Sequence, residues 1–355
     1  MKSRVIDVHA HLLPKEAWTI PKADGFVRIT DREGDLHLGP TSIALDGPSL
    51  ADPERMIADM DRCGIDVRVV SVPPYAFPLD AGTAEAEHYC ELSTQVLVDS
   101  CACAPDRLWP LGQVPLDSAE SAATAMERLA STGVRGIEVP TIIAGQPVGQ
   151  GIGKEILRAA AGLGMPVLVH PVQFQHPELS EHYLNNLIGN PYETSVAVAS
   201  CALGGVLDEL PDLRLLFAHG AGCAPILVGR WDHGWRRRRD VGVAGVRPPS
   251  EVLRGRVFVD AITFHAAAAR LTAEVFGREA MVLGSDYPFD MGDPDPVESA
   301  HKADLDLEEM SANALRWLGI RDDADSEGMP GDVSAATSHP TRGSAASGDT
   351  ERVDG

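Results

Sequence analysis

Two histidines stand two residues apart at the end of an apolar run near the start of the chain. The run is VIDVHAH, residues 5–11, and a β-strand would project Asp7, His9 and His11 to the same face. Both imidazoles could then reach one point. Neutral imidazole nitrogen is a preferred ligand of Zn²⁺ and similar divalent ions, so this spacing predicts part of a metal site.

Three more residues of ligand type end other apolar runs. They are His170 in VLVHP, His219 in LFAHGAG and Asp286 in LGSDYPF. A lone histidine after an apolar run is more often a hydrogen-bonded core residue. Five such residues at four strand ends are hard to explain by packing, because burying each polar group without a partner costs free energy. Together they predict a catalytic divalent metal centre with one open coordination position.

The elements that must position these residues form a series of eight short apolar segments, at 5–9, 67–72, 108–114, 134–139, 165–170, 213–219, 256–261 and 280–286. Between them lie helical patterns, including 53–64, 84–104, 118–133 and 153–164, with apolar residues three and four apart. Strands that alternate with helices predict a parallel sheet, and eight repeats predict a closed α/β barrel, the (β/α)₈ TIM barrel. Enzymes of this fold place their chemistry at the carboxyl ends of the strands.

Two segments interrupt the alternation. Residues 14–50 combine turn signals with short alternating pieces, which predicts a small β excursion after strand 1 and a lid-like insertion over the barrel mouth. Residues 321–355 are rich in Ser, Gly, Ala and Asp and nearly lack large apolar residues. We expect a disordered C-terminal tail there, and one barrel domain over residues 1–320.

The charge balance excludes some classes of partner. The 355 residues carry a formal net charge of −22, which argues against nucleic acid and anionic membrane surfaces because both require basic partners. We find no apolar run of the ~20 residues needed for a membrane span and no secretory signal pattern. The six scattered cysteines favour reduced thiols. We therefore expect a cytoplasmic protein.

The motifs VIDVHAH, VLVHP, LFAHGAG and GSDYPF resemble those of the metal-dependent amidohydrolase superfamily, in the branch of α-amino-β-carboxymuconate-ε-semialdehyde decarboxylase. The resemblance covers most of residues 4–320. It implies one divalent ion, Zn²⁺ with Mn²⁺ or Fe²⁺ as alternatives, held with a water by His9, His11, His170 and Asp286. It also implies that His219 is the acid/base residue beside that water, with Asp286 as a second catalytic group.

The resemblance further implies that Arg230, in the VGR element, grips a carboxylate of a small carboxylic acid substrate. In that branch the arginine reaches the site of the partner subunit, so a homodimer is expected. Without the family, an ordinary surface or interface arginine is the more frequent case. Candidate lining residues follow the fifth strand, and each is equally explained by loop packing: Val172, Phe174, His176 and Tyr183.

The chain departs from family patterns at two places. The fourth strand, VRGIEVPT, lacks the lysine that two-metal hydrolases carbamylate, which favours one metal, although Glu138 could bridge a second ion or form an ordinary salt bridge. The segment GPTSIALDGPSLADPE lacks an arginine of the named decarboxylase, so we expect a different substrate. The predicted function is a decarboxylase (C–C lyase) of a small unsaturated or aromatic acid that needs no organic cofactor. The alternative is a metal-dependent hydrolase or hydratase of a small amide, lactone or unsaturated acid.

Overall fold

The computed structural model describes residues 4–320 except 24, 34, 40, 44, 46, 80 and 173–176. Eight parallel strands form a barrel in it: β1 (Ile6–His11), β6 (Val67–Ser71), β7 (Leu108–Pro110), β8 (Ile137–Pro140), β11 (Val167–His170), β12 (Leu215–Phe217), β13 (Phe258–Asp260) and β14 (Met281–Val282). Hydrogen-bonded ladders join β1-β6-β7 and β8-β11-β12-β13-β14. Parallel bridges from Gly112 to Ile137 and from Asp7 to Leu283 close the ring. The predicted (β/α)₈ barrel is confirmed.

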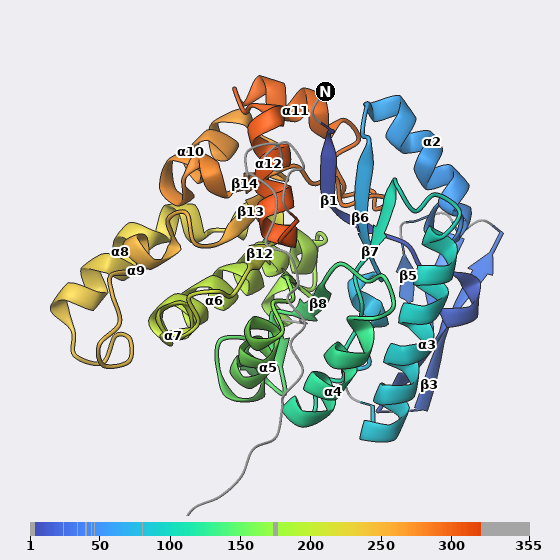
Figure 1. The fold of residues 1–355 in the computed structure, drawn as a ribbon, viewed down its shortest axis with the longest axis horizontal. Coiled ribbons are helices and arrows are strands. Elements are labelled where there is room, and N and C mark those ends of the chain that lie inside the picture. The colour runs from blue at the N-terminus through green and yellow to red at the C-terminus, as the bar shows by residue number, and fades with distance from the viewer. Residues whose placement is uncertain are drawn as a thin grey trace, which may run out of the picture. The chain divides into compact units, whose positions relative to one another are not determined.

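Helices surround the strands, and the chain colour advances once around this ring (Figure 1). The longer helices are α2 (Pro53–Cys63), α3 (Thr83–Cys101), α4 (Ala119–Leu129), α5 (Gly151–Gly162), α6 (Asn190–Leu203), α8 (Ala224–Arg237), α10 (Ala266–Phe276) and α12 (Leu307–Leu318). Shorter ones are α1 (Gly47–Ala51), α7 (Val206–Glu209), α9 (Pro249–Leu253) and α11 (Pro296–Lys302). The local sequence sets their ends. The Asp52 side chain caps α2, and Gly64 ends that helix with φ +72°.

Alternation along the strands decides which side chains face the barrel interior. In β11, Val167 and Val169 pack in one cluster with Ile156 of α5, so they face the helices. Leu168 belongs to a different buried cluster, which it shares with residues of six other barrel strands. Since strand side chains alternate, His170 lies on the same face as Leu168 and points inward at the carboxyl end.

Residues 19–43 form the predicted β excursion, a separate antiparallel sheet in the order β2 (Thr19–Lys22), β3 (Gly25–Arg32), β4 (Asp35–Leu38), β5 (Thr41–Ile43). A second small hairpin, β9 (Ile142–Ile143) with β10 (Gln146–Pro147), follows β8. The excursion is confirmed, whereas its action as a lid stays a prediction. The predicted disordered tail, residues 321–355, lies outside the described residues.

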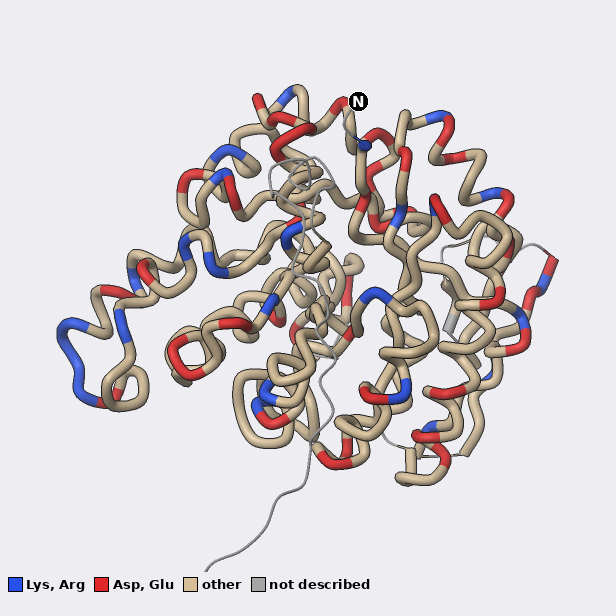
Figure 2. The backbone as a smooth tube through the Cα atoms, in the orientation of Figure 1, with Lys and Arg blue, Asp and Glu red and all other residues tan. Residues whose placement is uncertain are grey.

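The distribution of charge agrees with the acidic composition. Basic residues gather at the outer end of α8, where residues 236–239 are exposed, and acidic residues are spread over many other elements (Figure 2). Two of these arginines pair with nearby acids, Arg236 with Asp232 and Arg238 with Asp240. None of the described helices is both long and apolar enough to cross a bilayer.

Candidate active site

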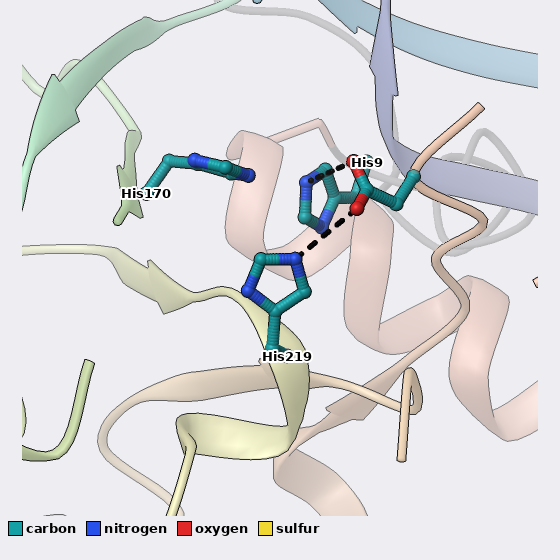
Figure 3. Close-up of side chains that lie close together, drawn as sticks. His9, His170 and His219 are labelled. Carbon is teal, nitrogen blue, oxygen red and sulfur yellow. Dashed lines mark hydrogen bonds and ion pairs between the residues drawn. The ribbon is translucent and has the colours of Figure 1, made fainter. Parts of the chain in front are cut away.

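Four imidazoles meet inside the carboxyl-terminal mouth of the barrel. His9 and His11 come from β1, His170 ends β11, and His219 begins the short turn η5 (His219–Ala221) directly after β12. The ring centroids of His9 and His170 lie 4.9 Å apart, and those of His170 and His219 lie 5.1 Å apart. His9, His170 and His219 point toward one another from three different parts of the ring (Figure 3). The structure therefore brings together side chains that are more than 200 residues apart.

Each of the three most buried imidazoles is oriented through its Nδ1 atom. His9 Nδ1 lies 2.7 Å from Asp260 Oδ2, His11 Nδ1 lies 3.1 Å from the Val72 carbonyl oxygen, and His170 Nδ1 lies 2.7 Å from the Pro171 carbonyl oxygen. Partners of this kind fix the tautomer with the proton on Nδ1. The Nε2 lone pairs then face the common centre.

Asp286 supplies the oxygen of the cluster. Its Oδ1 lies 3.1 Å from His11 Nε2 and 3.5 Å from His9 Nε2, and its Oδ2 lies 3.3 Å from His219 Nε2. The residue follows β14 with φ +58°, a conformation that is strained for a side chain other than glycine. Its backbone N–H donates to the carbonyl oxygen of His9 at 2.8 Å. This bond holds the carboxylate next to the imidazoles of β1.

The cluster fits a divalent metal ion. The Nε2 atoms of His9, His11 and His170 and Oδ1 of Asp286 are buried and have no hydrogen-bond partner among the described residues. Buried polar atoms normally have one, so this shared deficit points to a ligand at their centre. Ligand atoms of His9, His170, His219 and Asp286 also lie within 4.8 Å of one another. His219 is thus close enough to ligate as well as to act on a substrate.

A family model described as amidohydrolase matches residues 6–320. The chain belongs to the amidohydrolase family. The 2-amino-3-carboxymuconate-6-semialdehyde decarboxylase of Caenorhabditis elegans is 29% identical over 90% of this chain and 95% of its own length. Two solved structures share the fold. An IDCase of Metarhizium anisopliae in apo form has a TM-score of 0.76 at 22% identity, over 90% of this chain and 97% of its own.

The second structure is a 5-carboxyvanillate decarboxylase of Novosphingobium aromaticivorans, complexed with manganese and 4-hydroxy-3-methoxy-5-nitrobenzoic acid. Its TM-score is 0.72 at 20% identity, with 90% of this chain and 97% of that one covered. The resemblance inferred from the four motifs, to the amidohydrolases and their decarboxylase branch, is confirmed by these comparisons.

The imidazoles of this amidohydrolase site differ in the direction in which their pKa values are shifted. Burial lowers the pKa of His219, but the hydrogen bond and charge of Asp286 outweigh it, so the pKa is raised from its ordinary value. Burial, reinforced by the neighbouring imidazoles, holds the pKa of His170 well below its usual range. Although burial opposes it, the imidazoles of His11, His219 and His9 around the carboxylate keep the pKa of Asp286 well below the ordinary value. His219 is thus suited to carry a proton and His170 to offer a lone pair.

A buried ion pair lies beneath the cluster. Asp7 accepts from Arg68 Nε at 2.8 Å, and neither side chain has exposed surface. The same carboxylate accepts from the Ser285 backbone N–H at 3.1 Å and the Ser285 hydroxyl at 2.6 Å. Ser285 precedes Asp286, so this network fixes the start of the segment that carries the metal-facing carboxylate. Asp7 is thus a buried ion-pair residue of the barrel core.

Asp260 is a site residue that sequence reasoning missed. Besides His9 Nδ1, its carboxylate accepts from the backbone N–H groups of His219 and Gly220, both at 2.9 Å. One side chain therefore orients a candidate ligand and the turn that presents the acid/base residue. Asp260 ends β13, in the run RVFVDA, so the rule that identified the other strand-end residues would have found it.

Glu138 is buried on β8, on the strand face opposite Ile137 and Val139, and it forms no salt bridge with the described residues. Neither of its carboxylate oxygens makes a hydrogen bond that satisfies normal geometry with the described residues. Burial raises its pKa to about 8, against the opposing effects of His11 and Ser71. The salt-bridged alternative therefore has no partner among the described residues, and the bridging of a second ion stays a prediction.

A cavity of about 420 Å³ opens over the cluster and contains His170, His219 and Asp286 in its wall. Tyr183 lines this cavity, and so does Ile43 of the β excursion, whereas the binding of substrate by Tyr183 stays a prediction. Val172 is not one of the described residues that line this cavity. Val172 packs against the core, and its backbone N–H donates to Glu193 at 2.9 Å. Phe174 and His176 lie outside the described residues.

A second cavity, of about 330 Å³, meets the first at His219 and Asp286. Its wall is largely apolar and includes Ile226 and Phe264, whose exposed fractions are 75% and 58%. Arg230 is exposed on α8 and lines neither cavity in the described part of the single chain. The structure of the single chain therefore does not bring Arg230 into the site.

Proposed function

We propose that this amidohydrolase is a metal-dependent decarboxylase, which releases CO₂ from a small aromatic or unsaturated carboxylic acid without an organic cofactor. The observation that carries the proposal is the convergence of three unpartnered Nε2 atoms and one carboxylate beside a cavity whose wall includes His170, His219 and Asp286. The decarboxylase names of the relative and of the carboxyvanillate enzyme support the reaction class.

His9, His11, His170 and Asp286 would hold one divalent ion. The set of three imidazoles and one carboxylate suits Zn²⁺, the ion expected from the sequence, and Mn²⁺, which the carboxyvanillate decarboxylase binds. When bound, the ion supplies positive charge that stabilises negative charge on a substrate oxygen.

His219 would act as the proton donor. As the bond between the substrate carbon and its carboxylate breaks, CO₂ leaves and the electron pair stays on that carbon. The imidazolium of His219 gives its proton to the same carbon, and neutral His219 regains a proton from water. The Asp286 carboxylate, 3.3 Å from His219 Nε2, favours the protonated ring before this step.

The homodimer and the cytoplasmic location belong to this proposal. Arg230 lies one helical turn beyond Ile226 on α8, and residues four apart share a helix face. Ile226 lines the apolar cavity beside His219, so Arg230 stands just outside the site of its own subunit. From there it would reach the site of a second copy and bind a substrate carboxylate through paired, charge-assisted hydrogen bonds.

The test is a CO₂-release assay on the metal-loaded protein with hydroxybenzoates, aminobenzoates and dienoic acids. We expect CO₂ from at least one acid and one metal ion per chain. Release of acid from amides or lactones without any CO₂ would replace the proposal with the hydrolase alternative. His301→Ala provides a matched control. It removes an exposed imidazole on α11 that lines neither cavity, so this variant should keep full turnover.

A further inference from the structure

Tyr75 reaches the active-site cavity from a strand end that carries no candidate metal ligand. It lies in the short turn η2 (Pro74–Ala76), just after β6, and lines the 420 Å³ cavity together with His170 and Asp286. Its ring meets that of Phe289, another lining residue, edge to face with centroids 6.2 Å apart. The ring packing sets the direction of the hydroxyl.

The Tyr75 hydroxyl oxygen is buried and has no hydrogen-bond partner among the described residues. A buried hydroxyl without a partner costs free energy, and buried tyrosines usually find one. Tyr89 illustrates the usual case, since its hydroxyl donates to the carbonyl oxygen of Ala17 at 3.0 Å. Burial also raises the pKa of Tyr75, so its hydroxyl keeps its proton at neutral pH.

The cavity offers neutral and negative groups in addition to the histidines. Asn186 and Asn190 provide amides, Asp286 and Asp290 provide carboxylates, and the described lining residues include no lysine or arginine. The described wall of this cavity therefore has no lysine or arginine that could pair with a second substrate carboxylate. An uncharged oxygen on the substrate would find a donor in Tyr75.

We propose that Tyr75 is a substrate-binding residue, which donates its hydroxyl to an uncharged oxygen of the substrate and thereby decides which acids the site accepts. The group recognised is a hydroxyl or carbonyl oxygen held apart from the carboxylate that is lost. This inference rests on the proposed function, because it assumes that the acid binds in the cavity over the cluster.

The experiment measures binding of benzoate and of the three monohydroxybenzoates to the metal-loaded protein by calorimetry. The wild type should bind one hydroxybenzoate about three- to tenfold more tightly than benzoate, the value expected for one neutral hydrogen bond. Tyr75→Phe should abolish that preference while benzoate affinity stays within about twofold. For a hydroxy acid that is turned over, KM should rise by the same factor with kcat nearly unchanged.

Tyr89→Phe is the matched control, because it removes a buried tyrosine hydroxyl outside the cavity and should leave the preference intact. The proposal is overturned if the wild type prefers no hydroxybenzoate, if Tyr75→Phe keeps the preference, or if it weakens benzoate equally. Binding needs no CO₂ release. Loss of the preference in a protein that releases no CO₂ would therefore refute the proposed reaction and leave the role of Tyr75 standing.

Discussion

Replacing Arg68 with methionine should destabilise the barrel by about 3–5 kcal/mol, the usual result of removing one partner from a buried ion pair. The Arg68 side chain has no exposed surface, and it donates to Asp7 at 2.8 Å and to Asp59 at 3.1 Å. Methionine fills a similar apolar volume but leaves the Asp7 carboxylate buried without its cation. Asp7 cannot turn to water, since it also has no exposed surface.

Thermal unfolding followed by circular dichroism measures this effect. With an unfolding entropy of about 2.1 cal/mol/K per residue and roughly 320 residues in the barrel, the loss corresponds to a fall in Tm of about 5–7 °C. Lys302→Met is the control, because its partner Glu298 is at 3.4 Å with both side chains more than half exposed, and such pairs contribute little.

Adding Asp7→Asn to Arg68→Met should recover part of the loss, because the amide is uncharged and can still bond Ser285. A single Arg68→Met variant that melts within about 1 °C of the wild type would refute the reasoning. A double variant that is less stable than the single one would do so as well.

Three further predictions concern the site and the thiols. His170→Ala should lose the metal in elemental analysis, whereas His219→Ala should keep it and lose about 10²- to 10⁴-fold in CO₂ release; the reverse pattern would exchange their roles. Asp260→Asn should weaken metal binding about 10- to 100-fold in chelator competition, because His9 loses its charged Nδ1 partner, and an unchanged chelator curve would contradict this. A disulfide reagent at neutral pH should titrate the exposed Cys103 and Cys223 in the folded protein, and the buried thiols only after unfolding: Cys63, Cys90, Cys101 and Cys201.

The sequence could predict the barrel and the meeting of the five site residues, because both follow from strand alternation and from the end of the strand where barrel enzymes act. The orienting contacts could not be predicted in the same way. His170 Nδ1 bonds a backbone carbonyl oxygen, and His11 Nδ1 lies near both the Val72 carbonyl oxygen and the Ser71 hydroxyl. Backbone oxygens carry no residue signature. Tyr75 was missed because it reaches the cavity wall from a short turn after β6 and does not end a strand.

Arg230 marks the limit of reasoning from one chain. Its motif predicts a substrate contact, but its side chain is exposed and lies outside both cavities of its own subunit. A residue that acts across an interface leaves no trace in the packing of a single subunit. The resemblance supplied this role, and a mixture of Arg230→Ala and His219→Ala subunits, which should regain part of the activity, tests it.

Closure of the barrel and assembly of the site depend on the same contacts. β14 is only two residues long. Isolated hydrogen bonds, and not a continuous ladder, therefore join β1 to the segment that follows β14. These include the donation from His11 N–H to the Tyr287 carbonyl oxygen at 2.7 Å and the two bonds from Ser285 to Asp7. Because the strained Asp286 lies between Ser285 and Tyr287, any change that loosens this seam should lower metal affinity and Tm together. The Arg68→Met variant should therefore bind metal more weakly, although Arg68 contacts none of the candidate ligands.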